Sequence, residues 1–289
     1  MKVFFNRLPK DQPWGGGNQF LVEIVKYLAV AGHRVTYTLD EHDIDVLFVM
    51  DPRPGDLGYS IEHVLAYKHN HPSSRAILRV NECDKRKGTD FMDKLQLTAM
   101  QSVDEVVFIS KWLQEYYASR GFSGKSTVIY NGCNLKHFVP LNDKQFNIAH
   151  PRIVTHHWSD NWLKGFDIYV AIDKYLQKNP DAFKFTYIGR YNSTYIPVAT
   201  NVIAPCHGVV LGDKLRAHDI YVTASRWEPC GMHHIEAAAS GLPILYHAES
   251  GGIREKCCEH GLEFSSFEGF LSVLDELKKS FYSYRQLIN

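Results

Sequence analysis

The sequence predicts an α/β protein made of two doubly wound parallel sheets, and three observations lead to this class. Short apolar runs, typical of buried strands, alternate with amphipathic segments of helical period along most of the 289 residues. These runs form two successive series, separated by a polar stretch at 141–151 with a proline at each margin. Loops that carry glycine follow several expected strands, where parallel sheets bind ligands. We therefore expect one domain at 1–145 and a second at 146–289.

The first series opens as a strand, a glycine-rich loop, a helix and a second strand, which is a parallel βαβ unit. Asn18 is the expected N-cap of the helix, because its side chain can accept from a free backbone N–H group. The glycines before it, Gly16 and Gly17 among them, lack the spacing of a dinucleotide fingerprint. They form either a flexible turn or a loop whose backbone amides contact a ligand. The expected strands are 2–8, 33–39, 45–51, 75–81, 105–110 and 126–130, and the expected helices are 18–31, 60–70, 89–102 and 111–120.

The second series repeats the alternation and supplies the second sheet. Its loops again follow expected strands, so we expect a ligand site between the two halves. The last residues, 281–289, could cross back to the first domain. The expected strands are 152–157, 184–189, a short one near 202, 220–225 and 243–248, and the expected helices are 166–179, 213–218, 232–240 and 265–280.

The composition excludes several classes of protein. Lys plus Arg and Asp plus Glu both number 32, so no net basic field favours nucleic acid as a partner. Six cysteines occur without C-x-x-C spacing, which indicates reduced thiols and a cytoplasmic protein. We expect no signal peptide and no membrane-spanning helix, since no apolar run approaches about 18 residues. A peripheral membrane contact and the oligomeric state stay open.

The stretch 223–255 carries the strongest chemical pattern of the chain. Glu228 lies in a loop after an expected strand, and Glu236 lies in the first turns of the next helix. A phosphate cradle flanked by two carboxylates suits a nucleotide sugar. Each feature also has a purely structural explanation, since a glutamate in a first helical turn often only complements the helix dipole. The backbone N–H groups that favour a phosphate here belong to Gly231, Met232 and His233.

The complete string resembles the signature of retaining GT-B glycosyltransferases of the family-four type, the glycosyl transferases group 1. Glu228 and Glu236 meet the family's E-x7-E, inside S-x-x-E-P-C-G-x-x-x-x-E-A-x-A-x-G-L-P, and S-G-G-x-x-E follows at 250–255. The resemblance implies a GT-B fold of two Rossmann-like domains, with the acceptor side in the first and the sugar donor in the second. It implies retaining, metal-independent transfer of a hexose from a UDP- or GDP-sugar to a glycan, lipid or small-molecule acceptor. The nucleotide sugar is a co-substrate, and no cofactor is implied.

Lys164 is the third charged residue that we expect to act on the donor. It precedes Gly165 and the start of a helix, so its ammonium and the helix N-terminus can face the same anion. A surface lysine near a helix start is the structural alternative. The loop resembles the family's R-x-x-x-x-K-G, but the arginine falls on Ser159. Arg190, directly after an expected strand, is the candidate substitute, and we expect catalysis from Glu228, Lys164 and Arg190.

The remaining donor-binding assignments also follow from the resemblance. Asn81 occupies the strand end where many relatives have a histidine that touches the donor sugar, with Glu82 and Asp84 as alternatives. The family has a glycine pair at Gly16 and Gly17. Segment 126–138 resembles its V-I-x-N-G-V exit from the first domain, with Cys133 at the second valine. The turn residues expected beside the donor are Ser250 and Gly251.

Three alternatives stay open. A related GT-B epimerase or phosphorylase would share the site, and a non-catalytic module would bind the sugar nucleotide without turnover. If Glu228 were a nucleophile, a second acid about 5 Å away would be expected.

The histidine pairs at 156–157 and 233–234 suggest a metal site, but adjacent residues on a strand or helix point in different directions. We therefore expect no metal there.

Overall fold

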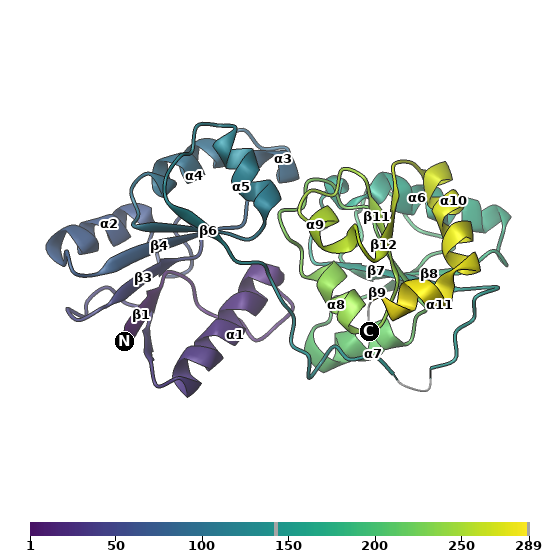
Figure 1. Cartoon of the computed structure of the whole chain (residues 1–289), viewed down its shortest axis with the longest axis horizontal. Coiled ribbons are helices and arrows are strands. Elements are labelled where there is room, and N and C mark those ends of the chain that lie inside the picture. Colours follow the sequence, from purple (N-terminus) through teal and green to yellow (C-terminus); the bar gives the residue numbers. More distant parts are fainter. Residues whose placement is uncertain (142–143, 288–289) are drawn as a thin grey trace. The chain divides into compact units, whose positions relative to one another are not determined.

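The computed structural model describes residues 1–141 and 144–287 and confirms an α/β protein with two Rossmann-like parts. The chain divides into two compact units, Met1–Asn131 and Gly132–Asn289. Among the described residues, each unit holds one sheet of six strands, and all strand pairs in both sheets are parallel (Figure 1). Residues 132–145, expected at the end of the first domain, are grouped with the second compact unit.

The first sheet has the order β2-β1-β3-β4-β5-β6. Val, Ile and Phe dominate its central strands, as expected for residues that pack on a pleated surface. Leu47, Leu78 and Phe108 are fully buried on one face of the sheet. The strands are β1 (Lys2–Phe5), β2 (Arg34–Thr36), β3 (Val46–Val49), β4 (Arg75–Val80), β5 (Glu105–Phe108) and β6 (Ser126–Val128).

The first helix corrects one expectation. It begins at Gly16, and Gly15, with a φ of 93°, precedes it, so Asn18 is not the N-cap. The side-chain amide of Asn18 instead bonds the backbone N–H and the carbonyl of Lys10, both at 2.7 Å. Asn18 therefore fixes the glycine-rich loop onto the helix. The helices of this unit are α1 (Gly16–Val30), α2 (Ile61–Asn70), α3 (Asp84–Lys87), α4 (Met92–Met100) and α5 (Lys111–Ala118).

The second sheet has the order β12-β11-β10-β7-β8-β9. Its edge strand β12 and the short helix α9 were not expected, because the sequence at 254–264 mixes charged and apolar residues without a clear period. Helix α7 begins earlier than expected. The strands are β7 (Arg152–His157), β8 (Lys184–Gly189), β9 (Asn201–Ile203), β10 (Ile220–Thr223), β11 (Ile244–His247) and β12 (Gly261–Phe264). The helices are η1 (Trp162–Lys164), α6 (Phe166–Lys178), α7 (Gly208–Arg216), α8 (His233–Ala239), α9 (Arg254–Cys257), α10 (Phe267–Lys279) and α11 (Phe281–Gln286).

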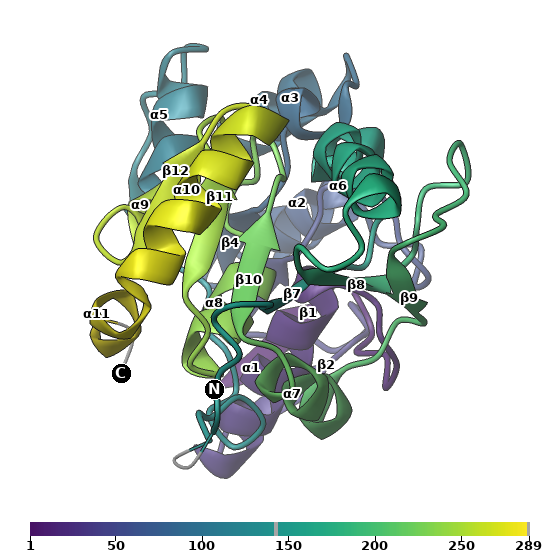
Figure 2. The ribbon, with the colours of Figure 1, turned by 90° about the vertical axis from the view of Figure 1, so that its right-hand side faces the viewer.

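Two apolar layers form the core of the second unit, one on each face of its sheet. Helices α6 and α10 cover one face, and α7 and α8 cover the other (Figure 2). Alternate strand residues reach the two layers: Ile153 packs with α6, whereas Val154 packs with α7 and α8. Phe281, in the last helix, is buried in the α6 layer. Helix α11 thus packs on the second unit.

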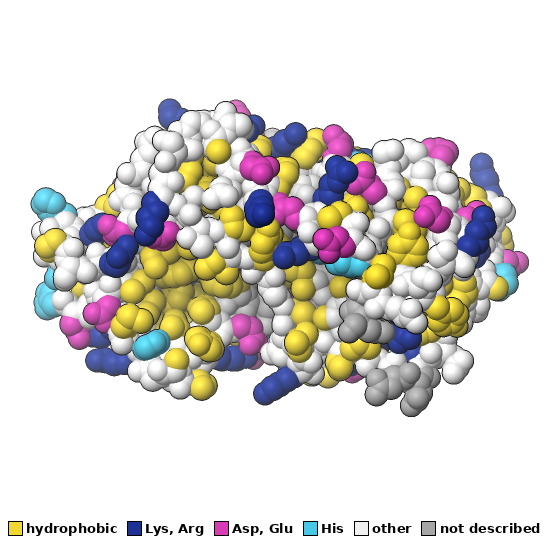
Figure 3. Space-filling view, viewed as in Figure 1, with side chains coloured by type: hydrophobic (Ala, Val, Ile, Leu, Met, Phe, Trp, Pro, Cys, Tyr) yellow, Lys and Arg dark blue, Asp and Glu magenta, His cyan; other side chains and the backbone are white. Residues whose placement is uncertain are grey.

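The surface agrees with the balanced composition. On the face shown in Figure 3, Lys and Arg side chains are interspersed with Asp and Glu side chains. In the described part of the chain, none of the helices has the length and hydropathy needed to span a membrane.

Candidate functional site

The loops that follow β7, β8, β10 and β11 carry most of the residues predicted to bind the donor. These four strands are neighbours in the sheet and run parallel, so their carboxyl ends share one edge. Ligands of doubly wound sheets bind outside this edge. This edge belongs to the second unit.

Lys164 and Glu228 meet at this edge as a buried ion pair. Lys164 ends η1, which follows β7, and Glu228 lies in the loop after β10. The Nζ atom of Lys164 donates to Oε2 of Glu228, and the two residues are only 9% and 4% exposed. Such a pair must recover the cost of desolvating both charges through close contact. The structure thus brings together two side chains that were expected to act on the same ligand.

Gly165 explains how the lysine is held in place. Its φ is 99°, in the left-handed region that favours glycine. A Cβ atom at this position would overlap the side chain of Ala224 and lie 2.6 Å from the carbonyl carbon of that residue. The turn after Lys164 therefore packs directly against the end of β10.

The loop that carries Glu228 is strained at Trp227. Trp227 has a φ of 50°, and it is the one residue other than glycine with a positive φ in the described ranges 1–141 and 144–287. For a bulky side chain this costs about 1–2 kcal/mol. The N–H of Trp227 donates to the carbonyl of Glu249 at 2.7 Å, and the N–H of Arg226 donates to that of Leu163 at 2.9 Å. These bonds to both neighbouring loops hold the strained conformation.

The turn at Ser250 and Gly251, expected beside the donor, lies next to Glu228. The N–H of Glu228 donates to the carbonyl of Ser250 at 3.1 Å, and the N–H of Gly252 donates to the carbonyl of Glu228 at 2.9 Å. Glu228 and Gly251 thereby form an isolated parallel bridge. The buried hydroxyl of Ser250 makes no hydrogen bond within the described part of the chain.

Glu236, the second acid, lies in α8 and is also buried. Its Oε2 accepts a hydrogen bond from Nε2 of His156, at the end of β7, over 2.8 Å. The sequence analysis considered His156 only as a metal ligand, and in the structure it orients the carboxylate. The E-x7-E pair thus contacts two different residues of the β7 edge: Glu228 binds Lys164, and Glu236 binds His156.

Gly231 lets the loop pass close to both Glu228 and helix α8. A Cβ atom at Gly231 would overlap the imidazole of His233 and lie 3.1 Å from Cγ of Glu228. Met232 is the N-cap of α8, and the first N–H groups of a helix have no acceptor within it. The backbone N–H groups of residues 231–233, which were expected to bind phosphate, therefore lie three to five residues after the buried carboxylate of Glu228.

Neutral imidazoles line this region. The rings of His157 and His233 pack edge to face, with their centres 4.7 Å apart. Burial, and then the charge of Lys164, lower the pKa of His157 well below its usual range, and burial and His157 do the same to the pKa of His233. Nε2 of His157 hydrogen-bonds the Tyr169 hydroxyl at 2.9 Å. Within residues 1–141 and 144–287, no group of three or more His, Cys, Asp or Glu side chains could hold a metal ion.

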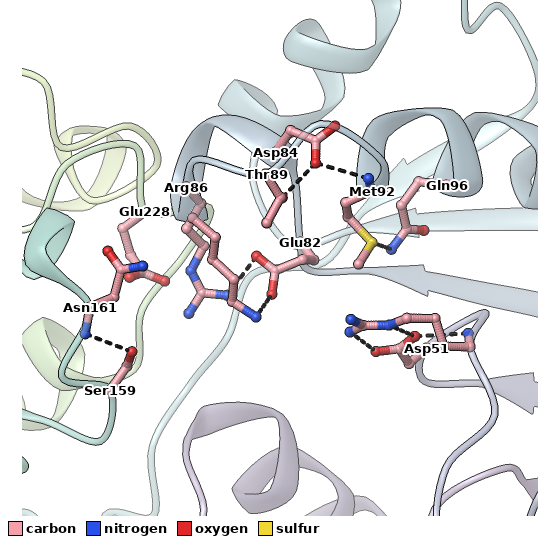
Figure 4. A network of polar contacts seen from close by, with 12 residues as sticks. Asp51, Glu82, Asp84, Arg86, Thr89, Met92, Gln96, Ser159, Asn161 and Glu228 are labelled. Carbon is pink, nitrogen blue, oxygen red and sulfur yellow. Dashed lines mark hydrogen bonds and ion pairs between the residues drawn. The ribbon is translucent and has the colours of Figure 1, made fainter.

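Arg190 and Ser159 lie at the same edge but make other contacts. The guanidinium of Arg190, after β8, stacks over the ring of Trp158 at 3.9 Å. The hydroxyl of Ser159 accepts from the N–H of Asn161 at 3.2 Å (Figure 4). Ser159 thus lies within the loop between β7 and η1, and Arg190 packs on the same loop through Trp158. Arg190 is exposed, and its side chain is fixed by the tryptophan rather than by an acid.

In the first unit, Gly16 and Gly17 open α1, close to the end of β4. A Cβ atom at Gly17 would lie 3.4 Å from Nδ2 of Asn81, so these two predicted positions are neighbours. The two alternatives to Asn81 have structural partners (Figure 4). Glu82 pairs with Arg86 at 3.1 Å and with Lys87 at 2.5 Å. Asp84 accepts from the N–H of Met92 at 2.8 Å and the hydroxyl of Thr89 at 2.6 Å, so it fixes the start of α4.

The sequence analysis does not single out Arg226 or Asp167. In the structure, Nη1 and Nη2 of Arg226 donate to the two carboxylate oxygens of Asp167 at 2.7 and 2.6 Å. A signal for this pair does exist. Asp167 lies two residues after Gly165, and Arg226 lies two residues before Glu228, so opposite charges flank the two motifs.

Comparison with known families gives one match. Residues 211–272 match the family model described as Glycosyl transferases group 1. This segment runs from α7 to α10 and contains Glu228, Gly231 and Glu236. No curated protein sequence matches the chain.

Several solved structures resemble the whole chain. Sucrose-phosphate synthase from Thermosynechococcus elongatus has a TM-score of 0.75 at 16% identity, over 100% of this chain and 92% of that chain. Alr3699/HepE of Anabaena, in complex with UDP and glucose, has a TM-score of 0.76 at 11% identity, over 99% and 92%. WaaG, a glycosyltransferase involved in lipopolysaccharide biosynthesis, has a TM-score of 0.68 at 12% identity, over 99% and 94%. These likenesses establish the two-domain fold.

Proposed function

We propose that this chain, which has the GT-B fold and whose residues 211–272 match the glycosyl transferases group 1 family model, transfers a hexose from a nucleoside diphosphate sugar to an acceptor. The observation that carries the proposal is the buried Lys164–Glu228 pair, which lies beside the Gly231 loop at the carboxyl edge of the sheet. A cation, a carboxylate and the first N–H groups of a helix at one edge suit a ligand with both phosphate and hydroxyl groups.

The chemistry we assign to Lys164 is stabilisation of the leaving group. As the bond between the anomeric carbon and the diphosphate oxygen breaks, negative charge grows on the diphosphate. A fixed ammonium and N–H groups aimed at that charge lower the barrier by several kcal/mol. The buried position of Lys164 strengthens this effect, because little water screens it. We propose that Arg190 assists from the neighbouring strand end, and that the reaction needs no metal and no cofactor.

We propose that the configuration at the anomeric carbon is retained. The acceptor oxygen attacks on the face from which the diphosphate leaves, and its proton passes to a diphosphate oxygen. Glu228 then orients sugar hydroxyls rather than forming a bond to the anomeric carbon. Its contact with Lys164 favours this role, since a carboxylate that shares an ammonium is a weaker nucleophile. We assign the binding of the ribose hydroxyls to Glu236, whose carboxylate is oriented by His156.

The sugar donor that we favour is a UDP- or GDP-hexose, because the HepE structure contains UDP and glucose in the same fold. The acceptor that we propose is a glycan, lipid or small molecule. We propose that the protein acts in the cytoplasm, and a peripheral contact with a membrane is compatible with this proposal. The alternatives are a related GT-B epimerase or phosphorylase and a non-catalytic binding module. The first would share the edge described above, and the second would bind without turnover.

A thermal-shift panel of UDP-, GDP- and ADP-sugars tests the proposal. We expect one nucleotide class to raise the melting temperature, and the labelled sugar of that donor to appear on an acceptor with retained configuration. Glu228→Gln is expected to bind the nucleotide but not to transfer sugar. An isomerised sugar would indicate an epimerase, a sugar phosphate would indicate a phosphorylase, and unchanged behaviour of Glu228→Gln would indicate a binding module.

A further inference from the structure

The guanidinium of Arg226 connects the loops on either side of it. Nη1 and Nη2 donate to Oδ1 and Oδ2 of Asp167 at 2.7 and 2.6 Å, which is a two-pronged contact. Nε lies 3.7 Å from a carboxylate oxygen of Glu249. The Arg226 side chain is only 15% exposed, whereas its main partner Asp167 is 39% exposed, so the guanidinium is the buried member of the contact. Bidentate contacts of this kind fix both the separation and the orientation of the two groups.

Each partner lies next to a residue of the candidate site. Asp167 is in the first turn of α6, three residues after Lys164. Glu249 directly precedes Ser250, whose carbonyl accepts from the N–H of Glu228. One guanidinium therefore joins the loops that follow β7, β10 and β11, and these are the loops that carry the ion pair and the Ser250 turn.

Trp227 adds a reason why the loops need such a connection. It lies between Arg226 and Glu228 and has a φ of 50°, a conformation that a tryptophan adopts only when its surroundings impose it. The backbone bonds at 226 and 227 reach one loop each, and the Arg226 side chain reaches both. The same three loops thus impose the strained turn that brings Glu228 to Lys164.

We propose that Arg226, acting with Asp167, is a positioning residue that sets the place of Lys164 and Glu228 relative to each other. It acts through these two residues and not on the ligand. The role rests on the proposed function, because its effect is on the affinity for a diphosphate. A displacement of about 1 Å in such a site can lower the rate roughly 100-fold.

Diphosphate and monophosphate nucleotides separate positioning from general stability. Lys164 acts on the diphosphate, so its displacement weakens binding of UDP, GDP or ADP more than binding of the corresponding monophosphate. A loss of overall stability weakens both equally. The measurement is isothermal titration of both nucleotides of the base that binds the wild-type protein best, together with the melting temperature.

The chain offers a matched control at the opposite edge of the same sheet. Nε and Nη2 of Arg152, at the start of β7, donate to the two carboxylate oxygens of Asp219 at 2.9 and 2.7 Å. We expect Arg226→Met and Asp167→Asn to lower diphosphate affinity roughly tenfold and monophosphate affinity less than about twofold. Arg226→Lys should retain more diphosphate affinity than Arg226→Met, because lysine keeps the positive charge but cannot make the bidentate contact with the carboxylate. Arg152→Met should lower the melting temperature and leave the ratio of the two affinities unchanged.

If the ratio of diphosphate to monophosphate affinity were the same in Arg226→Met and Arg152→Met, the positioning role would be overturned. If Arg226→Met fails to fold, Asp167→Asn and Arg226→Lys decide in the same way. A wild-type protein that binds none of the three diphosphates would overturn the proposed function itself, and the positioning role with it.

Discussion

Lys164 and Glu228 are 64 positions apart in the chain, and their side chains form an ion pair that is buried on both sides. They reach each other from the ends of β7 and β10, which are neighbours in the sheet. Adjacent parallel strands place their carboxyl ends at one edge, so distant residues meet there without any local signal. Each charge is costly to bury and is stabilised by its partner.

Removing one member of this pair is expected to cost nearly as much unfolding free energy as removing both. The two single losses should therefore add up to more than the loss in the double variant. Lys164→Met leaves a buried carboxylate without its ammonium and should cost about 3–5 kcal/mol. Glu228→Gln leaves the ammonium without its carboxylate. In the double variant two neutral side chains occupy the same space, so its loss of unfolding free energy should be well below the sum of the single losses. Urea denaturation of the three variants measures this, and additive losses would contradict it.

The sequence predicts the class of fold and the main acids because their signals are local. Strand and helix periods depend on neighbours within a few residues, and Glu228 and Glu236 belong to one short string. The predicted start of α1, residue 18, is two residues later than the observed start at Gly16. The amide of Asn18 bonds Lys10, and residue type alone does not distinguish such a contact from an N-cap. Strand β12 is missed because its pairing with β11 outweighs a weak period.

Contacts between residues far apart in the chain are the hardest part of the site to predict, because charges beside two motifs do not by themselves show which side chains pair. The bidentate bond of Arg226 to Asp167 and the bond of His156 to Glu236 both join residues more than fifty positions apart. The positive φ of Trp227 arises from bonds to two other loops, and tryptophan itself gives no sign of it. The roles expected of all the site residues, from Glu228 and Lys164 to Arg190, Ser159 and Asn81, stay predictions.

Gly165→Ala is expected to be more damaging than Gly121→Ala, although both glycines have nearly the same backbone. Their φ angles are 99° and 97°. A Cβ atom at Gly121 meets nothing within 4 Å, whereas one at Gly165 overlaps Ala224. Gly121→Ala should cost about 1–2 kcal/mol from backbone strain alone. Gly165→Ala should cost about 1–3 kcal/mol more through overpacking, and it should also displace Lys164.

Chemical denaturation of the two glycine variants gives their stability, and titration with a nucleoside diphosphate gives the effect on the site. Equal losses of stability would show that the turn after Lys164 can move away from β10. The packing argument would then fail.

Asp173→Asn is expected to weaken the attachment of the loop at 195–200. The buried carboxylate of Asp173 accepts from the N–H of Thr200 at 2.7 Å and from the hydroxyl of Tyr195 at 2.8 Å. Burial alone would raise the pKa of Asp173, but these hydrogen bonds outweigh it and lower the pKa from 3.8 to about 2. The carboxylate therefore contributes about 2 kcal/mol of stability that is present above pH 4 and is lost as the pH falls towards 2.

The asparagine variant should be less stable than the wild type by about 2 kcal/mol at pH 7, and the difference should shrink below pH 4. Urea denaturation between pH 7 and 3 measures this. Exposed Asp275, in α10, supplies the control variant Asp275→Asn, which should lie within about 0.5 kcal/mol of the wild type. A difference that does not change with pH would contradict the assigned cause.

His234, in α8, is a buried polar residue whose two ring nitrogens have no hydrogen-bond partner within the described ranges. Burial lowers its pKa from 6.5 to about 3. Between pH 6.5 and 3, His234 therefore binds a proton in the unfolded chain but stays neutral in the folded chain. Stability falls as the pH drops through this window, by about 2 kcal/mol between pH 6.5 and 5.

Replacing this histidine with leucine is expected to stabilise the protein. His234→Leu removes two buried polar atoms that lack partners, which should raise the free energy of unfolding by about 1 kcal/mol at pH 7. It also removes the proton uptake, so the variant should lose less stability than the wild type between pH 7 and 5. Exposed His69, replaced in the same way, should leave the pH dependence unchanged. Denaturation curves at both pH values decide, and a variant that is less stable at pH 7 would show that the ring of His234 has a polar partner in solution.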